Sequence, residues 1–87
     1  MFVIKVIATA TEQNKNFKGD IQTTYYGKQE KILSSEKLPA KWLVDGFGFK
    51  TKGAACSAMK ALKEVHDWFE KCYNTWTYEH SVVEIPN

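Results

Sequence analysis

An amphipathic segment at residues 52–73 constrains this chain more than any other feature. Apolar side chains recur there at intervals of three and four residues, and charged side chains occupy the positions between them. This spacing predicts an α-helix with one apolar face. Thr51 is typical of a helix N-cap, and Asn74 is typical of a left-handed residue that ends a helix. The apolar face consists of Ala55, Ala58, Met59, Leu62, Val65, His66, Phe69, Cys72 and Tyr73.

A helix with one apolar face must bury it against another layer, and the remaining chain predicts an antiparallel sheet of four to five strands. Residues 2–9 are rich in β-branched side chains and alternate, which indicates a first strand. Residues 21–26 predict a second strand. Residues 29–35 indicate a third after a turn at Gly27. Residues 76–85 predict a last strand that is long enough to lie in the centre of the sheet.

Residues 42–50 allow two interpretations. Asp45-Gly46 is typical of a type I′ hairpin turn, with Phe47–Phe49 as the returning strand. A single bulged strand through the same residues is the alternative. The expected fold is therefore α+β, in the order β-β-β-(β)-α-β, with the helix packed on the sheet. Eighty-seven residues correspond to a single domain, 1–87, with one core.

The residues that could carry chemistry do not form a recognisable site. The histidines and cysteines lack the close spacing of zinc ligands. Two histidines have acidic neighbours in sequence, but neighbouring side chains diverge on a helix or a strand and do not form a preset dyad. We therefore expect no enzyme activity, no metal and no cofactor. The residues considered are Cys56, Cys72, His66 and His80.

The cysteines and the hydropathy indicate where the chain resides. On one helix, Cys56 and Cys72 would lie about 24 Å apart, which is too far for a disulfide. Free thiols are typical of a reducing compartment. No apolar run approaches the ~20 residues that cross a bilayer, and the first residues do not resemble a secretory signal. We expect a cytoplasmic protein that does not enter a membrane.

The charge is unevenly distributed. Residues 1–52 carry nine lysines and five acidic residues, a net charge of +4, whereas residues 53–87 carry three lysines and five acidic residues, a net charge of −2. Every basic residue is a lysine, and the absence of arginine argues against sequence-specific reading of bases. Aromatic and lysine side chains can still bind single-stranded nucleic acid by stacking and charge. The residues placed for this alternative function are Tyr25, Tyr26, Lys28 and Lys31.

The aromatic content favours protein binding. Three tryptophans, four tyrosines and five phenylalanines are many for one small core, and one helix cannot cover both faces of a sheet. Grouped exposed aromatics usually mark an interface, and Trp68 lies on the flank of the helix. We therefore predict a non-enzymatic protein-binding module, although an uncovered sheet face or edge would equally serve a homodimer. Exposure is expected among Phe17, Tyr26, Trp42, Phe47, Trp68 and Trp76.

One stretch resembles a known group of proteins. Gly46-Phe-Gly-Phe-Lys-Thr-Lys-Gly-Ala-Ala55, followed by a helix and by Val82-Val-Glu-Ile85, is similar to small uncharacterised proteins encoded by phages and prophages of low-GC bacteria. In these, a strand ending in F-x-T-K-x-A-A leads into a helix, and a final strand closes the sheet. Some of them inhibit host machinery, including anti-CRISPR proteins. The resemblance implies an inhibitor of a host protein or protein complex in the host cytoplasm, and the mixed charge argues against an acidic DNA mimic.

Overall fold

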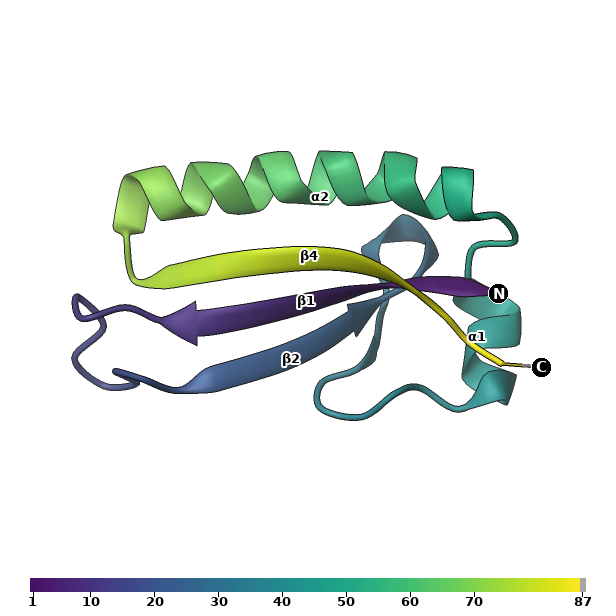
Figure 1. Cartoon of the computed structure of the whole chain (residues 1–87), viewed down its shortest axis with the longest axis horizontal. Helices are drawn as coiled ribbons and strands as arrows, with labels where there is room; N and C mark the ends of the chain where they lie inside the picture. The colour runs from purple at the N-terminus through teal and green to yellow at the C-terminus, as the bar shows by residue number, and fades with distance from the viewer. Residues whose placement is uncertain (87) are drawn as a thin grey trace.

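The structure, a computed structural model, describes residues 1–86 and consists of an antiparallel sheet with a long helix across one face (Figure 1). A 3₁₀ turn, η1 (Lys28–Glu30), follows the second strand. The α+β class predicted from the sequence is confirmed. The strands, in the spatial order β3-β2-β1-β4, are β1 (Phe2–Ala10), β2 (Ile21–Tyr26), β3 (Ile32–Ser34) and β4 (Trp76–Glu84). The helices are α1 (Lys41–Phe47) and α2 (Lys52–Tyr73).

The long helix α2 begins and ends where the sequence predicts. The hydroxyl oxygen of Thr51 accepts a hydrogen bond of 3.2 Å from the backbone N–H of Ala54, which caps the first turn. Asn74 adopts a left-handed φ of 49°, and its N–H donates to the carbonyl of Glu70. This geometry ends the helix and lets the chain turn back into β4.

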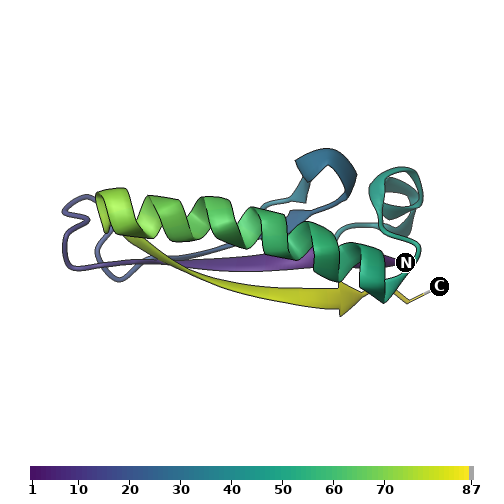
Figure 2. The same cartoon turned by 90° about the horizontal axis from the view of Figure 1, so that it is seen from above.

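Alternation along β1 divides the core between the two faces of the sheet. Ile4 and Val6 lie beneath α2, in a cluster with Phe49, Ala55 and Leu62. Val3 points to the other face, where α1 covers a second cluster. Figure 2 shows α2 running the length of the sheet and α1 confined to the end that holds both termini. The buried residues of the second cluster are Val3, Tyr25, Leu33, Val44 and Ile85.

The prediction of a hairpin or bulged strand through residues 42–50 is wrong, because Lys41–Phe47 form α1. Neither Asp45 nor Gly46 has the positive φ that a type I′ turn requires. Burial overrides local strand propensity here: the helix turns Val44, which is fully buried, into the second cluster. Only Phe49 pairs as a strand residue would, exchanging two hydrogen bonds of 2.8 Å with Phe2.

Two further expectations about the sheet need correction. The third strand is shorter than residues 29–35, because η1 places Gln29 and Glu30 at positive φ before β3 begins. The last strand does not lie in the centre, since β4 is an edge strand beside β1. The chain turns directly from α2 into β4, and β4 pairs with β1 beneath the helix. Glu70 accepts a 2.8 Å hydrogen bond from the N–H of Tyr78 and so covers part of this edge.

Candidate protein-docking surface

The structure does not gather the five binding residues chosen from the sequence. Tyr25 is only 6% exposed and lies in the cluster under α1. Tyr26, the next residue of the strand, faces α2 on the opposite side of the sheet. Lys28 and Lys31 are exposed beside η1. Trp68 lies on α2, where it belongs to a different surface.

Trp68 belongs to a group of exposed aromatic rings on the C-terminal half of α2. Trp68, Phe69 and Tyr73, which we call the aromatic cluster, are 55%, 38% and 60% exposed. Their ring centroids lie 5.4 Å (Trp68–Phe69), 6.1 Å (Trp68–Tyr73) and 6.1 Å (Phe69–Tyr73) apart. The spacing of four residues places Phe69 and Tyr73 side by side on the helix, and the large ring of Trp68 reaches both of them. The exposed Val65 lies one turn before Phe69 and extends this surface.

Two hollows adjoin the aromatic cluster. The first, of about 370 Å³, lies between the end of α2 and the start of β4. The second, of about 260 Å³, lies between α2 and strands β1 and β2, and we call it the inner hollow. Both are lined by Phe69, Trp76 and Tyr78. The inner hollow is also lined by Val6, Ala8, Gln22, Thr24, Tyr26 and His66.

A pair of histidines lies beside the inner hollow. His66 Nδ1 of α2 and His80 Nε2 of β4 are 2.6 Å apart, a hydrogen-bond distance. His66 is buried and stacks on Tyr78, with ring centroids 4.2 Å apart and planes at 9°. The sequence placed each histidine only beside its neighbours in the chain, so this pair was missed. Two features of the sequence could have indicated it. His66 lies on the apolar face of the helix, and His80 points to the same face of its strand as Tyr78 and Val82.

Burial is the main reason that the pKa of His66 and the pKa of His80 are both lowered. A second cause for His66 is the nearby His80, and nearby Glu70 and Asp67 oppose the effect at both rings. Burial also raises the pKa of Tyr26 and the pKa of Tyr78. The pair is therefore neutral at pH 7, with one ring donating and the other accepting. This hydrogen bond links α2 to β4.

Residues 1–86 contain neither a metal-binding cluster nor a membrane-spanning helix. No three or more His, Cys, Asp or Glu side chains come together there in an arrangement that could hold a metal ion. Neither α1 nor α2 within that range combines the length and the hydropathy needed to cross a bilayer.

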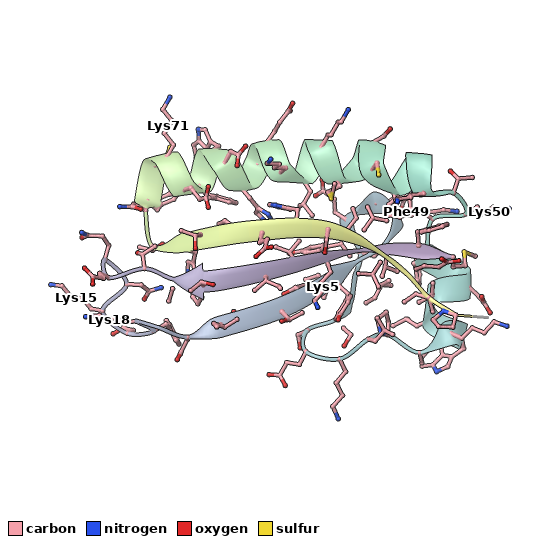
Figure 3. The ribbon with its side chains drawn as sticks, viewed as in Figure 1. Lys5, Lys15, Lys18, Phe49, Lys50 and Lys71 are labelled. Carbon is pink, nitrogen blue, oxygen red and sulfur yellow. The ribbon has the colours of Figure 1, made fainter. Side chains whose placement is uncertain are left out.

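Lysines share the end of the molecule that carries the aromatic cluster. Figure 3 shows Lys15, Lys18 and Lys71 at the end where α2 passes into β4, and Lys50 beside Phe49 at the opposite end. The first three are exposed. Exposed acidic side chains share this end, since Glu12 and Asp20 come from the same loop as Lys15 and Lys18, and Asp67 precedes Trp68 on α2. The charge around the aromatic cluster is therefore mixed. Phe17, from the same loop as Lys15 and Lys18, packs on Trp76 at 6.0 Å between ring centroids and connects that loop to the first hollow.

Comparison of the chain with protein-family models, curated proteins and solved structures found no match.

Proposed function

We propose that this protein is a binding module that docks on another protein through the aromatic cluster. The supporting observation is that Trp68, Phe69 and Tyr73 contact one another while each stays well exposed. Removing such an apolar surface from water is favourable, and folding of this chain leaves it exposed, so a partner that covers it gains binding free energy. Tryptophan and tyrosine are also the residues that most often dominate binding energy at interfaces.

The charge around the cluster is mixed, so the apolar rings rather than a net charge define the surface of the partner. Lys15, Lys18 and Lys71 lie at this end together with the exposed acidic side chains of its loop and helix, so we expect a partner with an apolar patch whose rim carries side chains of both signs. A host protein complex inhibited by a phage-encoded protein, as the sequence resemblance implies, is the partner class that we propose. Inhibition would follow from occupation of a surface that the complex needs.

Single-stranded nucleic acid is the alternative ligand, and the placement of the tyrosines weakens it. Tyr25 lies in the core and offers no face for a base to stack on. Tyr26 lies on the other side of the sheet, against His66 and partly covered by α2. Lys28 and Lys31 remain exposed but lack an adjacent pair of stacking rings.

The test is capture of partners by the full-length protein, compared between two matched tryptophan variants. Trp68→Ala removes the largest ring of the cluster. Trp42→Ala removes an even more exposed ring, 77% exposed, on α1 at the opposite end of the molecule. Both side chains are largely exposed, so neither change should unfold the protein, which circular dichroism checks.

We expect Trp68→Ala to reduce the amount of captured partner by about tenfold or more, as for an interface hot spot. Trp42→Ala should leave capture unchanged. Quantitative mass spectrometry of material captured from a lysate of the host cells measures both. Loss of capture with Trp42→Ala alone would place the interface on α1 and contradict docking through the aromatic cluster. Loss after nuclease treatment, with a steep dependence on salt, would favour the nucleic-acid alternative.

A further inference from the structure

The edge of β2 is unpaired along most of its length. Within residues 1–86, β3 pairs with β2 only at Tyr25 and Tyr26, so no strand lies beside Ile21–Thr24 on that side. In β2, the peptide groups of Gln22 and Thr24 face β1. The N–H of Ala10 in β1 donates to the carbonyl of Asp20. Every second residue of an antiparallel pair repeats this geometry, so Gln22 and Thr24, two and four residues after Asp20, also direct their peptide groups to β1. The peptide groups of Ile21 and Thr23 therefore point away from the sheet.

Space for another strand exists along this edge. A hollow of about 480 Å³ lies between Ile21–Thr24 and the segment that leaves β3 at Ser35 and Glu36. The edge also lacks the usual protection, since the stretch Ile-Gln-Thr-Thr contains no charge and no proline and Ile21 is 67% exposed. A strand edge of this kind is a template for pairing with an extended segment.

The free edge is continuous with the aromatic cluster. Gln22 and Thr24 line the hollow at the edge and also line the inner hollow next to Phe69 and Trp76. Their side chains face α2, as the alternation along β2 requires. A strand added beside them would therefore direct every second side chain to the same face, toward the inner hollow.

We propose that an extended segment of the partner protein adds to the sheet beside Ile21–Thr24 and places alternate apolar side chains toward the inner hollow. This inference deepens the proposed function and rests on it. The segment is uncharged at its centre, with β-branched or aromatic residues at the positions that face α2. A second copy of this chain is the poorer occupant, because four paired residues fall far short of the ~1,600 Å² that a stable protein interface buries.

The probe is a display library of random twelve-residue linear peptides, selected on the immobilised full-length protein. The tightest peptide is then synthesised and its Kd is measured on wild type, Thr23→Pro and Thr23→Val. Proline removes the outward N–H that an added strand needs and leaves the β1–β2 hydrogen bonds in place. Valine keeps that N–H and the shape of the side chain. We expect Thr23→Pro to weaken binding at least tenfold and Thr23→Val to change it less than threefold.

A second measurement does not depend on the folding of the proline variant. Amide hydrogen exchange of wild type should be fast at Ile21 and Thr23 and should slow at least tenfold when the selected peptide binds. Equal binding by wild type and Thr23→Pro, exchange that does not slow at these two amides, or a library that yields no binder would overturn the inference. If Trp68→Ala abolishes partner capture while Thr23→Pro preserves it, the proposed function stands and strand addition fails. If Trp68→Ala leaves capture intact, the proposed function itself fails.

Discussion

The hydrogen bond between His66 and His80 ties α2 to the sheet through two titratable side chains. The bond can form only while at least one ring is neutral, because two protonated rings would bring N–H groups face to face across 2.6 Å. Tyr78 covers one face of His66 and excludes water from it. The charged groups that act on the pair are Glu30, Lys63, Asp67 and Glu70.

We predict that the free energy of unfolding decreases as the pH falls below about 6.5, the pKa of an unfolded histidine. Both pKa values are lowered in the folded protein, so the unfolded chain binds more protons in this range and is favoured by acid. Each such histidine adds up to ~1.4 kcal/mol per pH unit to the slope. Urea unfolding between pH 7.5 and 5.5 measures the slope, which should be close to zero above pH 7.

The variant His80→Gln supplies the control for this prediction. An amide at position 80 can still hydrogen-bond to His66 Nδ1 but does not titrate. The slope between pH 6.5 and 5.5 should therefore be smaller in His80→Gln than in wild type. Equal slopes in the two proteins would show that the pair does not govern the response to acid.

The sequence predicts the relative orientation of neighbouring strand residues but not which of them is buried. Alternation alone requires Tyr25 and Tyr26 to lie on opposite faces of β2, as the structure has them. It does not say which face is covered, because this depends on where α1 packs, and the burial of Tyr25 follows from that. The His66–His80 contact likewise depends on β4 pairing with β1 directly beneath α2.

At the scale of elements, the two helices differ in how far their sequences determine them. The helix α2 has 22 residues with caps at both ends and a sustained apolar face, so its bounds could be read from the pattern. The helix α1 has seven residues, Ala40 as an N-cap without a side-chain hydrogen bond, and a glycine inside it. Residues this few do not establish a period, and the packing of Val44 decides their conformation.

Two glycines test the conformation of α1. Gly46 lies in the helix with nothing within 4 Å of an added Cβ, so Gly46→Ala should stabilise the protein by about 0.5–1 kcal/mol through helix propensity. At Gly27, an added Cβ would overlap the carbonyl oxygen of Phe47, so Gly27→Ala should destabilise the protein. Thermal unfolding of both variants measures the two signs. Destabilisation by Gly46→Ala would instead support a hairpin turn at this position, where alanine cannot readily adopt the positive φ.

At the scale of the whole molecule, the sheet separates two buried clusters that the sequence presented as one core. The domain is elongated, 40 × 22 × 15 Å, and α1 and the C-terminal half of α2 occupy opposite ends (Figure 1). Strand β1 links the clusters, because Val3 belongs to one and its neighbour Ile4 to the other. A second cluster was not predicted from the sequence, since it exists only because α1 folds back over the far face of the sheet.

Because both clusters contain residues of β1, we predict that the two ends of the molecule unfold in one transition. Neither cluster can keep its packing once β1 leaves the sheet, so partial unfolding would expose the other cluster as well. The double variant Trp68→Phe, Trp76→Phe leaves Trp42 as a fluorescent reporter on α1, and Trp42→Phe, Trp76→Phe leaves Trp68 on α2. Within each variant, the urea midpoint from fluorescence should equal that from circular dichroism. A lower midpoint for Trp42 fluorescence than for the helical signal would show that the α1 end unfolds separately, and the domain would then consist of two cooperative units.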